Sequence, residues 1–473
     1  MENILSTLAD ILWGLPLIIL VIGAGLFFTI GSRFFQFRKF SYIMKNTFGK
    51  IFKNDHKNNK EKGIVSPFQA VSIALASTIG VGNIAGVASA IALGGPGAVF
   101  WMWIAALVGM MTKMVEVTLA VHYREENTDG STFGGPTYYI KKGLGEEHGM
   151  KWWKLPAAIF IIGMFFVIFI SLQSYTVAES FESTFGIPML VTGTVYVVLT
   201  YIVLFGGIRR IAEMTSKVVP FMAAFYIIGG LIIIIKNIEN VVPSFQLIFT
   251  AAFNPMAAVG GFAGTGVSAA IRRGVSRSVY SNEAGFGTAP MAHATAKAKS
   301  AIDQGMWGVF EVFVDTMLVC TMTALIIISS GVWSSGVSGA SLTLLAFETG
   351  LGLPGKVLLT VSIFIFAWTT STGQWTYAET ILRFIFGESK INEQIIKGIR
   401  YIYPLSQFGM IVLAVTAGLP PKIMWLFADV MTALPTFINV FVCMALSGTF
   451  FKLLKDYEIR IKNNENVQIT NQQ

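Results

Sequence analysis

Two apolar stretches that contain glycine decide the fold of this chain: SIALASTIGVGNIAGVASAI at residues 72–91 and SVYSNEAGFGTAPMAHATA at residues 278–296. Each glycine weakens a helix by about 1 kcal/mol, and Pro290 removes a backbone donor. Both stretches are therefore expected to form helices that unwind in the middle. Unpaired backbone groups inside a bilayer are costly unless they line a polar cavity or bind a ligand. Corresponding broken helices in two halves of a chain are typical of a transporter binding site.

The two breaks align with each other, since Thr78–Ala85 (TIGVGNIA) and Glu283–Pro290 (EAGFGTAP) share the pattern G-x-G. Each break opens a set of five predicted spans, and an odd number gives the two sets opposite orientations. The pattern therefore predicts an inverted repeat of five plus five helices. Glycine-lined packing faces are the alternative interpretation, because small residues let helices approach closely. Asn282 and Glu283 favour a binding site, since they are poor packing residues in a membrane.

The composition indicates an integral membrane protein. Of the 473 residues, 54% are hydrophobic and 13% are charged, whereas soluble domains have roughly 25% charged residues. The net charge of +8 lies in short runs between apolar segments, which is typical of membrane orientation and not of nucleic-acid binding. Cys320 and Cys443 each lie in an apolar run, which predicts buried thiols. No nucleophile–base spacing, metal motif or channel filter is found, so the sequence favours neither an enzyme nor a channel.

A spanning helix needs about 20 mostly apolar residues. Eleven segments are predicted to meet that requirement: 8–31, 68–94, 97–122, 154–184, 187–207, 215–236, 275–296, 305–331, 355–385, 398–418 and 421–451. With loop 32–67 in the cytoplasm, the cytoplasmic loops hold 27 of the 34 Lys and Arg residues and the outer loops hold six, while Lys113 lies inside a span. This bias predicts an outside N-terminus and a cytoplasmic C-terminus.

The domain organisation follows from these spans. We expect an N-terminal helix with a basic loop (1–67), a first five-helix repeat (68–236), an extracellular capping segment (237–274), a second five-helix repeat (275–451) and a cytoplasmic tail (452–473). Residues 53–62 and 455–473 are polar, which predicts a flexible loop and a flexible tail. Residues 243–273 are expected to form an outer capping helix or loop and not a span.

Further polar residues interrupt other spans. The ninth span contains FAWTTSTGQWTYAE (366–379), in which the hydroxyls of Thr369–Thr372 either bind a small cation or bond to their own helix carbonyls. Gln173 in the fourth span either hydrogen-bonds a substrate or clamps a neighbouring helix. Glu311 and Asp315 in the eighth span, and Asp429 in the eleventh, form either a proton relay or structural pairs.

Several motifs resemble the alanine/glycine:cation symporter family, the sodium:alanine symporters of bacteria and archaea. They are STIGVGNIAGVASAIALGGPGAVFWMW (77–103), GGPTYYI (134–140), SNEAGFGTAPMAHATAKA (281–298) and the run at 366–379. The resemblance implies an all-α membrane protein of the LeuT-type inverted-repeat fold, with one helix ahead of a ten-helix core. It also implies sodium-coupled uptake of alanine or glycine by alternating access, in the plasma membrane of a prokaryote. We expect Na⁺ as the coupling ion with no other cofactor, a bilayer environment, no nucleic acid, and a monomer.

The resemblance also implies site residues. Sodium would be bound by the main-chain carbonyls of Ala76, Ile79 and Ala367 and by the hydroxyls of Thr370 and Ser371. Asn83 alone matches a second sodium site of some relatives. The amino acid would lie against Thr78, Ile79, Gly80 and Gly82, with Gln173, Asn282, Phe286 and Trp375 shaping the pocket. Two alternatives stay open: proton coupling through Glu283, Glu311 or Asp315, and sodium-coupled uptake of glutamine or serine.

Overall fold

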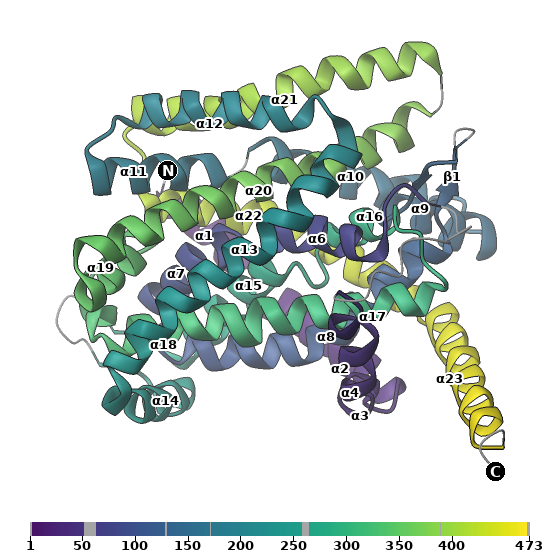
Figure 1. The fold of residues 1–473 in the computed structure, drawn as a ribbon, viewed down its shortest axis with the longest axis horizontal. Helices are drawn as coiled ribbons and strands as arrows, with labels where there is room; N and C mark the ends of the chain where they lie inside the picture. Colours follow the sequence, from purple (N-terminus) through teal and green to yellow (C-terminus); the bar gives the residue numbers. More distant parts are fainter. Residues whose placement is uncertain are drawn as a thin grey trace.

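The computed structural model of the chain describes residues 2–51, 63–127, 130–170, 172–257, 264–387 and 389–470. In these ranges the elements of secondary structure are helices, apart from one antiparallel hairpin of β1 (Glu125–Glu126) and β2 (Thr132–Phe133). The predicted loop at 53–62 lies outside the described residues. The all-α class predicted from the sequence is confirmed (Figure 1).

The first half of the chain forms helices that follow the predicted spans closely. The N-terminal region contains α1 (Glu2–Leu12), α2 (Leu15–Gly31), α3 (Phe35–Arg38), α4 (Phe40–Asn46) and α5 (Phe48–Ile51). The helices that follow are α6 (Pro67–Thr78), η1 (Gly82–Gly86), α7 (Val87–Gly94), α8 (Ala98–His122), α9 (Pro136–Tyr139), η2 (Ile140–Glu147), α10 (Lys154–Phe169), α11 (Leu172–Phe185), α12 (Met189–Leu204) and α13 (Gly207–Lys236). The predicted fourth span is therefore two helices, because the chain leaves helical geometry at Ile170 (φ −116°, ψ 61°).

The second half begins with α14 (Ile238–Phe253), a helix within the predicted capping segment. The remaining helices are α15 (Val267–Asn282), α16 (Ala289–His293), α17 (Ala301–Val312), η3 (Phe313–Cys320), α18 (Thr321–Ser329), η4 (Val332–Ser334), α19 (Ala340–Leu351), α20 (Leu353–Phe386), α21 (Lys390–Ala417), α22 (Pro421–Ala445) and α23 (Ser447–Thr470). The seventh predicted span thus starts at Val267 and not at residue 275. Helix α19 has no counterpart among the predicted spans.

The segment 455–470, for which the sequence predicts a flexible tail, is helical, since α23 continues to Thr470. Contacts from distant segments hold the first part of this helix. The Tyr457 hydroxyl donates to Asp303 at 2.7 Å, and Glu458 forms an ion pair with Arg38 at 2.6 Å. Composition alone carries no signal for such partners. In Figure 1, α23 projects away from the other helices and ends at the C-terminus.

Large apolar side chains point outward along the long helices. Ile19, Phe165, Val195, Phe221 and Leu405 are each at least half exposed, as expected of side chains that face lipid. By length and composition, eight helices in the described ranges can cross a membrane, and the pair Pro67–Thr78 and Gly82–Gly94, bent by 45°, makes a ninth. Helix α12 has only 16 residues, and the α15–α16 pair does not pass the same test. The chain is a multi-pass membrane protein, while the count of eleven spans stays a prediction.

The helices pack in two groups. In one group, α8 contacts α15, α16 and α17, and α15 contacts α7. In the other, α11 contacts α12, α20 and α21, and α12 lies beside α21, as seen at the top of Figure 1. Helix α13 contacts both α6 and α20, and α6 and α20 also touch directly. Of the two broken helices, the segments α6 and α16 contact α20, so they lie where the first group meets the second.

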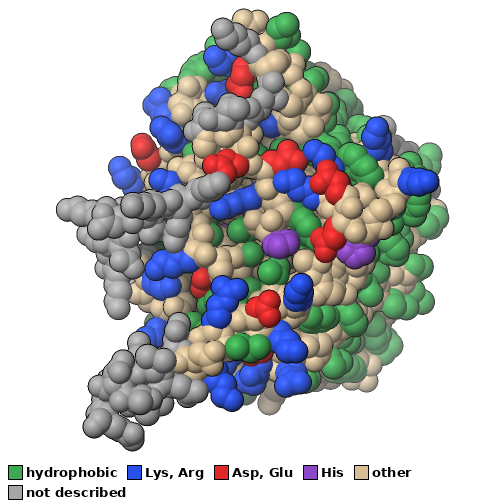
Figure 2. Space-filling model, turned by 90° about the vertical axis from the view of Figure 1, so that its right-hand side faces the viewer, with side chains coloured by type: hydrophobic (Ala, Val, Ile, Leu, Met, Phe, Trp, Pro, Cys, Tyr) green, Lys and Arg blue, Asp and Glu red, His purple; other side chains and the backbone are tan. Residues whose placement is uncertain are grey.

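The basic loops gather on one face. Figure 2 shows Lys, Arg, Asp and Glu side chains concentrated on the side of the molecule near β1 and α23. Contacts join these loops: Arg124 donates to the Ala296 carbonyl at 2.7 Å, and Arg38 forms an ion pair with Glu458 at 2.6 Å. Segments predicted to share the cytoplasmic side thus lie together, which agrees with the charge bias used to predict orientation.

Candidate functional site

The first broken helix unwinds directly after Thr78. Ile79 leaves helical geometry (φ −75°, ψ 89°), and the Gly80 N–H donates to Asn83 Oδ1 at 2.8 Å. A Cβ atom on Gly80 would lie 2.5 Å from Thr370 Oγ1, so glycine is required for this close approach of α6 to α20. The break predicted from the glycines is therefore present, and it lies against the polar segment of the ninth predicted span.

The second broken helix unwinds between Asn282 and Ala289. Glu283, Gly285 and Gly287 adopt left-handed φ angles of 56°, 87° and 87°. The N–H groups of Gly285 and Gly287 donate to the two carboxylate oxygens of Glu116 on α8, at 2.9 and 3.0 Å. Side chains of other helices thus satisfy the freed backbone groups, which is how irregular backbone persists inside a bilayer.

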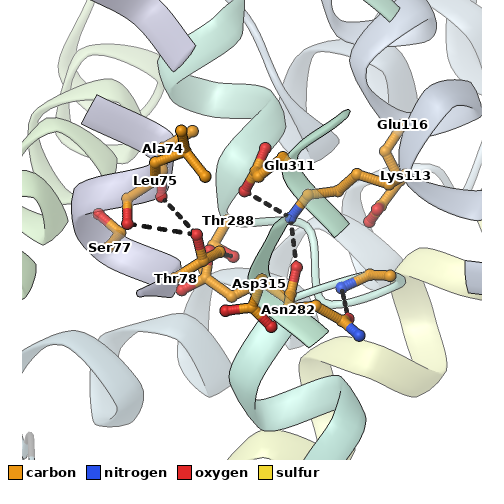
Figure 3. Close-up of polar contacts among 12 residues, drawn as sticks. Ala74, Leu75, Ser77, Thr78, Lys113, Glu116, Asn282, Thr288, Glu311 and Asp315 are labelled. Carbon is orange, nitrogen blue, oxygen red and sulfur yellow. Dashed lines mark hydrogen bonds and ion pairs between the residues drawn. The ribbon is translucent and has the colours of Figure 1, made fainter. Parts of the chain in front are cut away.

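A buried ion network supports the second break (Figure 3). Lys113 on α8 is fully buried; its Nζ donates to the Asn282 carbonyl at 2.8 Å and lies 3.2 Å from Glu311 on α17. The other Glu311 oxygen lies 3.1 Å from His293 Nε2 on α16. Asp429 is likewise paired, with Arg273 and Arg277. The sequence left pairing and proton relay open for Glu311 and Asp429, and the structure shows that both carboxylates are paired.

A cavity of about 30 Å³ lies between the two breaks. Its lining comes from both breaks and from α6, η1, α10, α11, α15, α20 and α22: Ser77, Thr78, Gly80, Gly82, Val167, Ile170, Leu172, Gln173, Tyr280, Glu283, Phe286, Gln374, Ala428, Met431 and Thr432. This volume holds one or two water molecules. An amino acid would therefore enter only with movement of the surrounding side chains or helices.

Most of the predicted substrate residues line this cavity. Thr78, Gly80, Gly82, Gln173 and Phe286 are in its wall. The Gln173 amide oxygen accepts from the Val81 N–H at 3.4 Å, which ties α11 to the first break. Gln173 therefore both faces the cavity and contacts a neighbouring helix.

Three of the predicted substrate residues are not among those that line the cavity. Ile79 is in the first break between two lining residues. Trp375 is fully buried and donates to Glu379 at 3.0 Å, and its neighbour Gln374 faces the cavity instead. Successive residues on a helix point about 100° apart, and the sequence did not determine which of the two faced inward.

Asn282 also lies outside the lining. Its side-chain amide donates to Ser278 and Thr316, each at 3.0 Å, and its Oδ1 accepts from the Ala284 N–H at 2.9 Å. Asn282 therefore holds the shape of the second break without lining the cavity.

The predicted cation ligands form two contacts. Thr370 Oγ1 donates to the Ala76 carbonyl at 2.8 Å, which joins α20 to α6. On α20 the Ala367 carbonyl accepts from the Tyr196 hydroxyl at 2.7 Å, and that hydroxyl lies 2.6 Å from Ser371 Oγ. Tyr196 on α12 was not anticipated as a neighbour of these ligands.

Asn83 lies apart from the Thr370–Ala76 contact. Its side-chain amide donates to the buried carboxylate of Asp315 at 2.7 Å. Ser281 and Thr316 donate to the same carboxylate at 2.9 and 2.8 Å. The sequence analysis gave two alternatives for Asp315, a proton relay or a structural pair. In the structure its carboxylate is surrounded by neutral hydrogen-bond donors.

The sequence did not predict that Glu116 binds the second break or that Glu283 lines the cavity. A signal for Glu116 was available, because Lys113 and Glu116 lie three residues apart in an apolar span, and ionisable groups inside a span are functional candidates. Their partners come from segments more than 160 positions away, so the contacts themselves have no local signature.

Two broken helices that face one cavity inside a multi-pass helical bundle define a membrane transporter of the LeuT-type fold. The solved structure of MhsT in complex with L-phenylalanine shares this fold, with a TM-score of 0.58 and 12% sequence identity over 80% of this chain and 89% of that one. The chain belongs to the sodium:alanine symporter family, whose sequence profile matches residues 1–471. This family consists of transporters and not of enzymes.

Two relatives illustrate the range of the family. The sodium/alanine symporter AgcS of Methanococcus maripaludis is 37% identical over 469 residues, which cover 98% of each chain. A Bacillus subtilis protein named "Probable sodium/glutamine symporter GlnT" is 34% identical over 97% of this chain and 91% of its own. The resemblance stated from the sequence motifs is thus confirmed at the level of the family.

Proposed function

We propose that this chain couples the inward flow of Na⁺ to the uptake of a small neutral amino acid, alanine or glycine, by alternating access. The observation that carries the proposal is the cavity between the two breaks, lined by Gly80, Gly82 and Gln173. The family and the named activity of AgcS support alanine, whereas the name of GlnT keeps glutamine, and with it serine, as the alternative.

The proposed cation site lies between α6 and α20. Its ligands are the carbonyls of Ala76, Ile79 and Ala367 and the hydroxyls of Thr370 and Ser371. Oxygen donors suit a hard cation, and the Thr370–Ala76 contact already brings two of these groups together. Because α6 and α20 touch where the two packing groups meet, a cation held by both helices would favour one arrangement of the groups.

Coupling follows if sodium and substrate favour the same arrangement of the two helix groups, because each ligand then raises the affinity of the protein for the other. The substrate would lie against Thr78–Gly82, beside the residues that face α20. A membrane potential of 100 mV contributes about 2.3 kcal/mol per charge moved, and the sodium gradient adds to this.

The proposed topology has eleven spans in a plasma membrane, with an outside N-terminus, a cytoplasmic C-terminus and one monomer as the unit. The five-plus-five inverted repeat would begin at the broken helices α6–α7 and α15–α16. The gathering of the basic loops on one face supports this orientation (Figure 2).

Uptake into proteoliposomes tests the function. Radiolabelled alanine is supplied with an inward Na⁺ gradient or an equal K⁺ gradient, at two pH values. We expect saturable uptake only with Na⁺, and competition by unlabelled glycine. Uptake driven by a pH gradient without Na⁺ would show proton coupling instead of sodium coupling. Stronger competition by glutamine or serine than by glycine would show that one of these amino acids is the substrate instead of alanine or glycine.

A further inference from the structure

Glu283 lies in the wall of the cavity in an unusual backbone conformation. Its φ angle of 56° is in the left-handed region, which favours glycine; among the non-glycine residues in the described ranges only Arg33 and Phe34 share it. Gly285 and Gly287 beside it also adopt positive φ angles. A glycine at 283 would satisfy the backbone better, so the reason for glutamate at this position lies in its side chain.

The Glu283 carboxylate has hydroxyl donors, and the charge of Lys113 also acts on it, but among the described residues it has no ion-pair partner. Its Oε2 accepts from the Thr288 hydroxyl at 2.6 Å and from the Tyr377 hydroxyl at 3.4 Å. Within the described part of the chain, no Lys, Arg or His forms an ion pair with it; Lys113 is paired with Glu311. Glu283 is only 4% exposed. A carboxylate this buried is costly unless a cationic group joins it.

A second acceptor faces the same cavity. Gln374 Oε1 on α20 is buried and has no hydrogen-bond partner among the described residues, and Gln374 lines the cavity. Tyr377, which donates to Glu283, lies one helical turn further along α20, so Gln374 and Tyr377 share a face of that helix. Among the described lining residues, Glu283 is the one charged side chain and the others are neutral.

We propose that Glu283 binds the α-ammonium group of the transported amino acid, with Gln374 Oε1 as a second acceptor; this inference rests on the proposed function. An ammonium group has three donors and one positive charge, which match a carboxylate and an unpaired amide oxygen. The carboxylate would thereby select amino acids against hydroxy acids of the same shape. Alanine and lactate differ in this way, since lactate has a hydroxyl in place of the ammonium.

Equilibrium binding to the purified full-length protein in Na⁺ tests this inference. Radiolabelled alanine gives its dissociation constant, and unlabelled lactate is measured by competition. We expect wild-type protein to bind alanine at least about tenfold more tightly than lactate, because a hydrogen bond to a charged group is worth about 10- to 100-fold. Equal affinities for the two ligands would overturn the assignment.

Two variants test whether Glu283 and Gln374 cause the preference for alanine over lactate. Glu283→Gln is expected to weaken alanine binding about 10- to 100-fold while changing lactate binding by no more than about threefold. Gln374→Leu should weaken alanine binding in the same direction but less. The matched control is Glu179→Gln, which removes a carboxylate that accepts from Ser341 and does not line the cavity; its alanine-to-lactate ratio should equal that of wild type.

The outcomes separate this inference from the proposed function. If wild-type protein does not bind alanine in Na⁺, the proposed function fails. If wild-type protein binds alanine and Glu283→Gln binds it equally well, only the role of Glu283 fails. A Glu283→Gln protein with unchanged alanine affinity but uptake that no longer responds to pH would make Glu283 a proton carrier and overturn the proposal. Should Glu283→Gln not fold, the wild-type ratio and Gln374→Leu decide the question.

Discussion

The substitution Gly80→Ala tests the contact between the first break and the proposed cation site. The new Cβ would lie 2.5 Å from Thr370 Oγ1, whereas ordinary contacts begin at 3.4 Å, so the hydroxyl must move by about 0.9 Å. That hydroxyl is held by the Ala76 carbonyl at 2.8 Å and the Phe366 carbonyl at 2.9 Å. A shift of this size away from α6 breaks the bond to Ala76.

The expected change in sodium dependence follows from the crowding of the new methyl group against the Thr370 hydroxyl. Inserting a methyl group into a closely packed contact costs about 1–3 kcal/mol. If sodium is bound by Thr370 together with the carbonyls on α6, this cost falls on the sodium-bound state. The sodium concentration that gives half-maximal alanine uptake should then rise by about 5- to 150-fold.

The assay is alanine uptake into proteoliposomes over a series of external sodium concentrations. Gly409→Ala is the matched control, because a Cβ there meets nothing within 4 Å and alanine is favourable inside helix α21. The control should match wild type, and Gly80→Ala should elute from a sizing column as wild type does. A folded Gly80→Ala protein with the sodium dependence of wild type would refute the reasoning.

Substitutions at three further positions, with two control variants, probe the site and its support. Thr370→Ala should raise the sodium concentration for half-maximal uptake while Thr370→Ser should not, and an unchanged value in Thr370→Ala would remove this ligand. Asn282→Ala leaves the Ala284 N–H without its acceptor, at a cost of about 1–3 kcal/mol; we expect uptake to be abolished with expression intact, and normal uptake would show that transport does not depend on this support of the second break. Lys113→Met removes the lysine partner of the buried Glu311 and leaves His293 beside it, and should lower the free energy of unfolding by about 3–5 kcal/mol. A lower melting temperature that Glu311→Gln partly restores is expected, and an unchanged melting temperature would contradict the ion pair.

The breaks were predictable because their cause is local. Glycine and proline disturb a helix wherever they occur, and both interruptions appear where Gly80 and Gly285 indicated. Helix lengths were less predictable. The kink at Ile170 has no glycine or proline beside it in the sequence, and the hydrogen-bond partner of Tyr457 in α23 comes from a distant segment.

The candidate site was predictable as a region but not in all of its residues. The motifs identified the segments that meet, since Gly80, Gln173 and Phe286 line one cavity. They did not determine which face of a helix points inward, so Trp375 was expected in the wall where Gln374 lies. Contacts that join distant segments, such as those of Glu116 to the second break, follow from tertiary packing and have no sequence signature of their own.

The most direct test of sodium symport uses an alanine gradient, in place of a sodium gradient, as the driving force. Proteoliposomes with equal sodium on both sides are given an inward alanine gradient at zero membrane potential, and the entry of radioactive ²²Na⁺ is followed. Coupled transport predicts that alanine drives net sodium accumulation, and that Thr370→Ala weakens it at low sodium. Alanine entry without net sodium movement would contradict the account.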